Sequence, residues 1–128
     1  MSNYTVKNLK QLDNAATQFG LGEGLEARFA RKALGLSSFG LSYQKLSPGF
    51  RIPFGHTHAT QEEVYVVLSG GGRIRLADEI VELVQWDAVR VPAEVPRALE
   101  AGEDGMEVLA IGAPVPDETE MLQGWWGD

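Results

Sequence analysis

The chain of 128 residues is long enough to bury one hydrophobic core and too short to bury two. Hydrophobic residues make up 44% and charged residues 23%, which is typical of globular proteins and excludes fibrous and disordered classes. The formal net charge is -7, and because an acidic surface repels phosphates and anionic lipids, we expect no nucleic acid and no membrane as a partner. The absence of cysteine also excludes a disulfide scaffold, a thiolate zinc site and a cysteine nucleophile.

The N-terminal segment shows no targeting signal. Residues 1–19 contain no apolar stretch of the length that a secretory signal requires. Elsewhere the longest wholly apolar run is residues 64–68, far short of the roughly 20 residues of a membrane helix. We therefore expect a cytoplasmic protein.

The first part of the chain predicts an irregular arm. Residues 8–16 could form one or two helical turns, and three glycines between positions 20 and 24 then break regular structure. Residues 25–34 fit two patterns: Leu25, Phe29 and Ala33 have helical spacing, whereas residues 26–29 alternate as in a strand. Both remain open, and we favour the strand.

From residue 39 onward the sequence reads as short strands. Segments of β character cover residues 39–46, 63–69, 73–76, 79–84, 88–91 and 106–111. Glycine, proline and aspartate stand between them, and the turn signals recur about every eight to twelve residues. This spacing predicts an all-β sandwich or barrel rather than alternating strands and helices.

Both histidines of the protein lie two residues apart, at His56 and His58. Positions i and i+2 of an extended segment project to the same side, so the two imidazoles converge. Glu63 opens the valine-rich segment five residues later, where a buried carboxylate needs a partner. Two imidazoles and a carboxylate match the set that binds iron, manganese, nickel or zinc. The alternative is a surface loop over residues 55–61 that holds two histidines by chance.

The run at residues 55–70, GHTHATQEEVYVVLSG, resembles the first motif of the cupin superfamily. That motif reads Gly, five residues, His-x-His, three or four residues, Glu, six residues, Gly. Here four residues separate His58 from Glu63 and six separate Glu63 from Gly70, while the leading glycine, Gly49, stands one position early. The resemblance implies a double-stranded β-helix, a jelly-roll barrel over residues 36–114, with an N-terminal arm at 1–35 and a tail at 115–128. It also implies a homodimer, because small cupins commonly pair by exchanging N-terminal strands.

The second cupin motif is altered in this chain. Pro92 occupies the proline position, but Arg97 stands where the family has a histidine that supplies the fourth metal ligand. Trp86 and Glu94 replace two glycines, and Ala101 replaces an asparagine. A guanidinium has donors only and a permanent positive charge, so Arg97 cannot bind a metal.

Two interpretations of the altered site remain open. In the first, His56, His58 and Glu63 hold a divalent transition metal (Zn, Ni, Fe or Mn), and Arg97 turns outward or awaits an anionic substrate. In the second, Arg97 pairs with Glu63 and leaves a metal-free pocket for a small anion. The predicted function is therefore small-molecule binding, with Arg97 favouring an anionic ligand. The alternative is a metal-dependent enzyme of the dioxygenase, isomerase or decarboxylase type that acts on a small carboxylate or sugar.

Other residues are candidates for contact with the ligand or the barrel. Gln44 and Tyr65 lie on strands expected to flank the pocket, and we predict a ligand-binding role for them. Arg73 and Arg75 share a strand face that could line the pocket mouth, although a solvated face is the favoured interpretation. Trp125 and Trp126 would form an apolar patch if exposed, so we expect them to dock on the barrel or on a neighbouring subunit.

Overall fold

The computed structural model describes residues 3–57, 62–112, 120–122 and 125–126. Helical structure in these parts is brief: the 3-10 helices η1 (Leu9–Gln11) and η2 (Ala15–Phe19) and the α-helical turn α1 (Arg31–Leu34). No helix among the described residues combines the length and the apolar character needed to cross a membrane. The strands are β1 (Leu25–Phe29), β2 (Gly40–Leu46), β3 (Gly55–Thr57), β4 (Glu63–Leu76), β5 (Glu79–Leu83), β6 (Ala88–Val91), β7 (Arg97–Gly112) and β8 (Glu120–Leu122).

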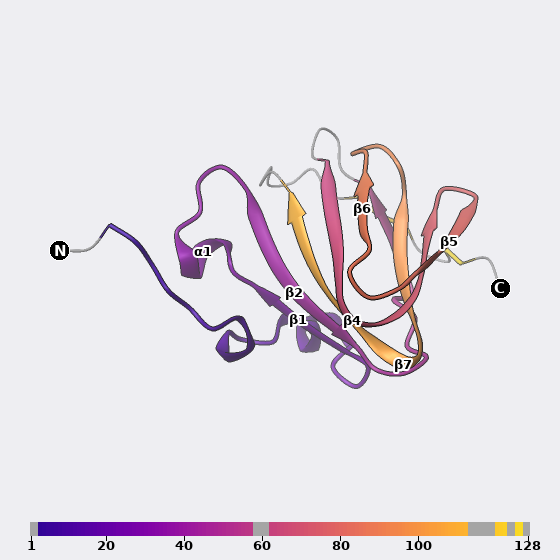
Figure 1. Ribbon diagram of the computed structural model, residues 1–128, viewed down its shortest axis with the longest axis horizontal. Helices are drawn as coiled ribbons and strands as arrows, with labels where there is room; N and C mark the ends of the chain where they lie inside the picture. The colour runs from indigo at the N-terminus through magenta and orange to yellow at the C-terminus, as the bar shows by residue number, and fades with distance from the viewer. Residues whose placement is uncertain (1–2, 58–61, 113–119, 123–124, 127–128) are drawn as a thin grey trace.

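Two long antiparallel strands, β4 and β7, organise the whole sheet. Glu63 pairs with Gly112 at one end of the β4–β7 ladder, and Leu76 pairs with Arg97 at the other. The first half of β4 also pairs with β6, and its second half pairs with β5. β2 and β1 extend the sheet beyond the C-terminal half of β7, while β3 and β8 extend it beyond the first residue of that strand. The predicted all-β jelly-roll barrel is thereby confirmed, as the curved sheet in Figure 1 shows.

A break in register at residues 67–72 bends β4 so that the two halves of the sheet face each other. Gly70 lies at this bulge with a φ of +68°, and a Cβ atom there would stand 2.1 Å from the carbonyl oxygen of Gly105. Only glycine combines that backbone conformation with so close an approach. The bulge therefore converts one long ladder into two opposed layers.

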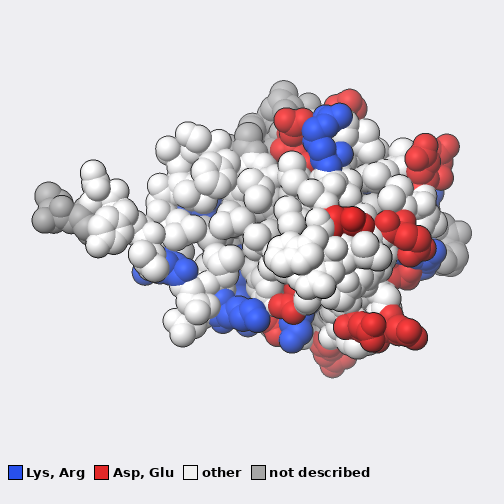
Figure 2. Space-filling model, viewed as in Figure 1, with Lys and Arg blue, Asp and Glu red and all other residues white. Residues whose placement is uncertain are grey.

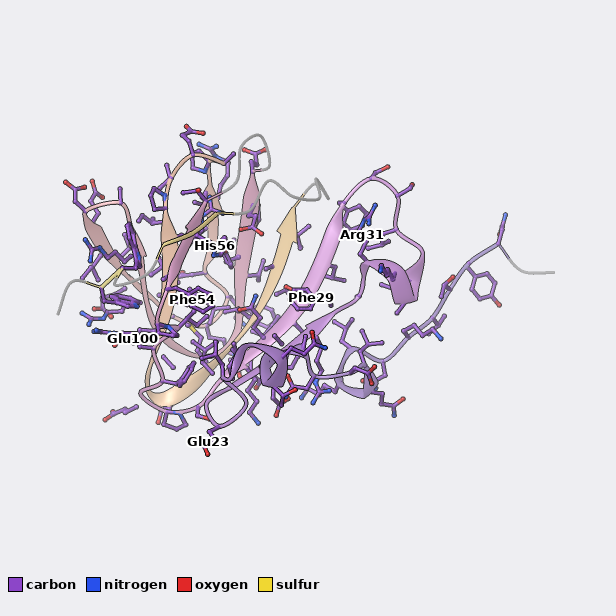
Figure 3. All side chains as sticks on the ribbon, turned by 180° about the vertical axis from the view of Figure 1, so that it is seen from behind. Glu23, Phe29, Arg31, Phe54, His56 and Glu100 are labelled. Carbon is purple, nitrogen blue, oxygen red and sulfur yellow. The ribbon has the colours of Figure 1, made fainter. Side chains whose placement is uncertain are left out.

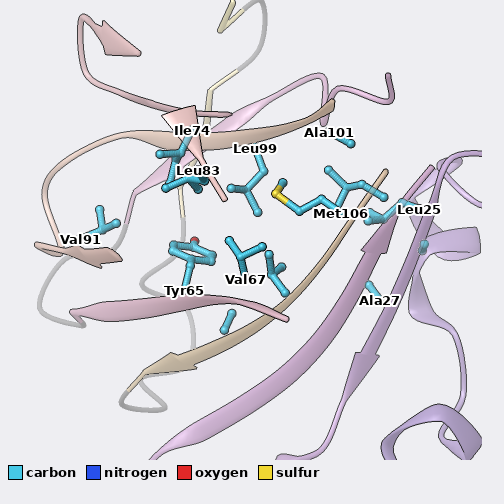
Figure 4. Close-up of a cluster of buried hydrophobic side chains, with 14 residues drawn as sticks. Leu25, Ala27, Tyr65, Val67, Ile74, Leu83, Val91, Leu99, Ala101 and Met106 are labelled. Carbon is cyan, nitrogen blue, oxygen red and sulfur yellow. The ribbon is translucent and has the colours of Figure 1, made fainter. Parts of the chain in front are cut away.

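The core lies between the two layers. Tyr65 and Val67 point from the first half of β4 toward Ile74 on its second half and Leu99 on β7, as Figure 4 shows. Val67 and Ile74 have no exposed surface. This packing follows from the alternation in the sequence, because every second residue of each strand faces inward.

Residues 25–34 adopt both structures that their sequence allowed, one after the other. β1 covers the first five, and the helical turn α1 follows and ends at Gly35. β1 pairs with β2 of the same chain, and Leu25 and Ala27 are part of the core. The segment expected as an arm at residues 1–35 therefore includes one strand of the barrel.

Charged side chains are unevenly distributed on the face drawn in Figure 2. Acidic residues gather over the end of the molecule that carries β5 and β6, whereas lysine and arginine are more frequent toward the N-terminal part. Glu79 and Glu82 lie on β5 itself. On the face drawn in Figure 2, negative charge is thus displayed mainly at one end of the barrel.

Candidate functional site

A small cavity lies inside the barrel, between the two layers. It has a volume of about 30 Å³, roughly the space of one or two water molecules. Its walls come from four segments of the chain and combine apolar with polar side chains. The lining residues are Gln44, Ile52, Phe54, His56, Tyr65, Arg97, Ala98 and Leu99.

Arg97 is the most deeply buried polar residue of the site, with 0% of its surface exposed. Its Nε atom donates to the carbonyl oxygen of Val95 at 2.9 Å, and Nη2 donates to that of Pro92 at 2.6 Å. Nη1 donates to Oε1 of Glu63 at 2.7 Å. The ion pair between Arg97 and Glu63, which the second interpretation predicted, is thus confirmed. Carbonyl oxygens of the turn at residues 92–95 accept the other hydrogen bonds of Arg97. Arg97 lines the cavity, but these three nitrogens are directed to protein oxygens.

Glu63 opens β4 and receives two donors on one oxygen. Besides Arg97, the hydroxyl of Tyr65 donates to Oε1 of Glu63 at 2.8 Å. The side chain of Glu63 is 12% exposed, so its charge is compensated largely within the protein. Burial of Tyr65, together with the negative charge of Glu63, raises the pKa of the Tyr65 phenol well above its ordinary value.

His56 is the most accessible member of this polar cluster. Its Nε2 atom lies 3.5 Å from Oε1 of Glu63 and 3.5 Å from the hydroxyl oxygen of Tyr65. The His56 side chain is 26% exposed, against 12% for Glu63 and 0% for Arg97. His58 falls outside the described residues, so the convergence of the two imidazoles stays a prediction.

The structure brings His56, Glu63, Tyr65 and Arg97 into one hydrogen-bonded cluster. Gln44, the other candidate for ligand contact, lines the same cavity from β2, where its amide donates to the hydroxyl of Ser42 at 3.4 Å. The ligand-binding roles of Gln44 and Tyr65 stay predictions.

The sequence analysis missed the apolar part of the cavity, which includes Ile52 and Phe54. A signal for them was present, because residues 52, 54 and 56 alternate along one extended segment that leads into β3. Figure 3 labels Phe54 and His56 on this segment.

His58 of the predicted metal-binding set lies outside the described residues, and the described residues alone do not form a metal site. No group of three or more His, Asp or Glu side chains with metal-binding geometry occurs among them. Oε1 of Glu63 already accepts from a permanent cation and from a phenol. A divalent ion placed beside this carboxylate would also be repelled by the guanidinium of Arg97.

The fold and the cluster together define a small jelly-roll barrel with an interior polar site. A family model of the cupin domain matches residues 42–112, which is more than half of the chain. The chain therefore belongs to the cupin-domain family. Uncharacterized protein MJ1618 of Methanocaldococcus jannaschii is 31% identical over 71 residues, which cover 53% of this chain and 57% of that protein. The chain thus matches little more than half the length of this curated relative.

Solved structures show the same fold. A cupin protein from Bacteroides fragilis (BF4112) superposes with a TM-score of 0.73 at 26% identity, over 91% of this chain and 89% of that one. Oxalate decarboxylase from Bacillus subtilis superposes with a TM-score of 0.78 at 24% identity. That match covers 98% of this chain but 34% of the enzyme, so this chain is similar to about one third of it.

Proposed function

We propose that this cupin binds a small carboxylate inside the barrel and that it does so without a metal ion. One observation carries the proposal: Arg97 holds Glu63 in a buried ion pair at 2.7 Å, beside a cavity that His56 lines. An interior cation is therefore already part of the chain. The accessible imidazole of His56 supplies the contact with the ligand.

The described charges of the site balance each other, so they do not repel an anion. Glu63 is the one carboxylate of the described cluster, and Arg97 neutralises it. An approaching carboxylate therefore meets no uncompensated negative charge there, and the imidazole of His56 can donate a hydrogen bond to it. The hydrogen bonds that Arg97 makes to carbonyl oxygens restrict its role to electrostatic support rather than direct contact.

At about 30 Å³ the cavity holds one or two water molecules, so it must widen to admit even a small ligand. Ile52, Phe54 and Leu99 would contact its apolar part, and Gln44 faces the same space. The likeness to oxalate decarboxylase concerns the fold alone, but it makes oxalate a suitable first probe. A metal-dependent enzyme remains the alternative function, with less support because Glu63 is engaged by Arg97.

The test measures the thermal midpoint and the affinity for oxalate, acetate and glucose of protein purified without a metal column. Oxalate or acetate should stabilise the wild-type protein, and His56→Ala should weaken the affinity about tenfold. Glucose should have no effect. Arg90→Ala, which alters an exposed ion pair with Glu62, is the matched control and should bind as the wild type does.

Three results would count against the proposal. Equal affinity in wild type and His56→Ala would remove His56 from the site. No response to either acid would refute a carboxylate ligand, and a response that requires added zinc or nickel would support the metal-dependent alternative.

A further inference from the structure

One wall of the cavity is held in place from outside by the C-terminal residues. Ile52, Phe54 and His56 line the cavity from the segment that leads into β3. Within the described residues, β3 pairs with β7 at one position, His56 with Arg97. On its other side it pairs with all three residues of β8, including His56 with Met121. Among the described pairs of β3, the three with β8 therefore outnumber the one with β7.

Two tryptophans that follow β8 contact the same wall. Nε1 of Trp126 donates to the carbonyl oxygen of Ile52 at 2.8 Å. The ring of Trp125 packs against Gly55 so closely that a Cβ atom there would lie 2.7 Å from the indole carbons. The expectation that these tryptophans dock on the barrel is thus confirmed, and they dock within one chain.

Arginines on the outer face of the sheet fix the two tryptophans. Nη1 of Arg75 donates to the carbonyl oxygens of Trp125 and Trp126, at 2.7 and 2.8 Å. The guanidinium of Arg75 also lies 4.6 Å from the ring centre of Trp125, and that of Arg51 lies 4.4 Å from the ring centre of Trp126. Both distances lie within the range of a cation–π interaction.

Arg73 lies 5.7 Å from the ring centre of Trp126, on the same outer face as Arg75. Arg73 and Arg75 therefore form neither the pocket mouth nor a purely solvated face. They support the C-terminal residues.

We propose that residues 120–122 and 125–126, which we name the clasp, position His56 in the cavity. The clasp lies outside the cavity, so Trp125 and Trp126 act through the wall and do not contact the ligand. Only the expected effect of the clasp on ligand binding rests on the proposed function. The orientation of His56 is a property of the ligand-free protein and can be measured independently. Without the clasp, β3 would be an edge strand of three residues held at one pair.

The test compares Gly55→Ala and Trp125→Leu with Gly40→Ala. The first two disturb the contact between Gly55 and the indole while leaving every cavity side chain intact. Gly40→Ala is the matched control, because a Cβ atom there meets only the carbonyl oxygen of Gly112 at 3.5 Å, an ordinary contact. Trp125→Phe keeps an aromatic ring and serves as the conservative variant.

The readout is the imidazole NMR signal of His56 in the ligand-free protein, assigned by its loss in His56→Ala. Gly55→Ala and Trp125→Leu should shift or broaden this signal and weaken oxalate binding about tenfold. Trp125→Phe should keep the His56 signal and the oxalate affinity close to those of the wild type, and Gly40→Ala should match the wild type in both. The chain has only two histidines, so the assignment is direct.

An unchanged His56 signal in Trp125→Leu would overturn the inference, even if the melting temperature fell, because the clasp would then only stabilise the fold. This outcome does not depend on oxalate. Conversely, a shifted His56 signal without oxalate binding would support the clasp and count against the proposed function alone. If Gly55→Ala fails to fold, Trp125→Leu and Trp125→Phe decide the question.

Discussion

Arg97 and Glu63 start two different strands and meet inside the barrel, with Nη1 and Oε1 2.7 Å apart. Arg97 begins β7 and pairs there with Leu76, at the end of β4 opposite to Glu63. The ion pair therefore connects the two layers that the bend in β4 creates. The guanidinium of Arg97 neutralises the carboxylate of Glu63. The carbonyl oxygens of Pro92 and Val95 accept further hydrogen bonds from Arg97.

Removal of the guanidinium should destabilise the protein strongly. Arg97→Met leaves the carboxylate of Glu63 buried without its cation, which costs about 3–5 kcal/mol. Urea unfolding of the variant measures this as a lower free energy of unfolding. The double variant Glu63→Leu with Arg97→Met should recover much of the loss, because no charge is then left unpaired.

An exposed ion pair of the same chemistry provides the control for that measurement. Nη1 of Arg90 lies 3.0 Å from Oε2 of Glu62, and both side chains are more than 60% exposed, at 64% and 62%. Arg90→Met should therefore cost no more than about 1 kcal/mol. If Arg97→Met lowers the free energy of unfolding by no more than Arg90→Met does, the ion pair of Arg97 with Glu63 does not connect the layers.

Restoring a histidine at position 97 should create affinity for a transition metal. Arg97→His removes the interior cation and adds an imidazole close to His56 and Glu63. Zinc at about 100 times its Kd would stabilise that variant by about 2.7 kcal/mol. The wild-type protein should show no comparable rise in thermal midpoint, and an equal rise in both would contradict the metal-free site.

The phenol of Tyr65 should stay protonated in alkaline solution while the protein is folded. Burial and the charge of Glu63 raise its pKa, so stability is fully present below the ordinary pKa of 10.0 and is lost as the pH rises above it. Tyr65→Phe should cost about 1 kcal/mol at neutral pH and should lose stability less steeply in alkali. In the folded state it should leave the tyrosinate absorbance unchanged. A weaker tyrosinate signal in folded Tyr65→Phe than in the folded wild type would contradict the prediction, because Tyr65 would then ionise in the folded protein.

Glu100 should contribute stability that disappears in acid. Burial acts to raise the pKa of its carboxyl, but hydrogen bonds from Arg51 and Arg73 outweigh burial and lower it. A carboxyl with a lowered pKa stabilises the fold above its ordinary value of 4.5, and this contribution is lost as the pH falls through the folded-state pKa. Glu100→Gln should reduce stability by roughly 1–2 kcal/mol at pH 7 and flatten the thermal midpoint between about pH 5 and pH 3.

The matched variant for that experiment is Glu103→Gln, which removes an exposed carboxylate from the same strand. It should retain the acid dependence of the wild type. Equal flattening in the two variants would show that Glu100 has no special part in the acid response.

The fold followed from local sequence features, because each strand is a short alternating segment between turn residues. Residues 88–91 were predicted at their observed bounds and residues 79–84 within one residue of theirs, whereas β7 begins at Arg97, nine residues before the predicted segment 106–111. The bend at Gly70 was not predicted, since three consecutive glycines read equally well as an ordinary turn. The helical turn after Phe29 was missed in part because both patterns overlapped there.

The site was predicted as a set of residue types rather than as a geometry. His56 and Glu63 were found by spacing, and the pair of Arg97 with Glu63 was one of the two interpretations left open. The carbonyl oxygens of Pro92 and Val95 that accept from Arg97 were not predicted. The contact of Trp126 with Ile52 spans 74 residues and has no local signal. The orientation of His58, the homodimer and the cytoplasmic location stay predictions.

The chain itself provides the cation of Arg97, whereas a bound metal ion has to be taken up from the surroundings. Arg97 accompanies every folded molecule in a ratio of one to one, so neither dilution nor a chelator can remove it. This cupin would therefore keep the same interior electrostatics in a cell starved of transition metals as in one that is replete.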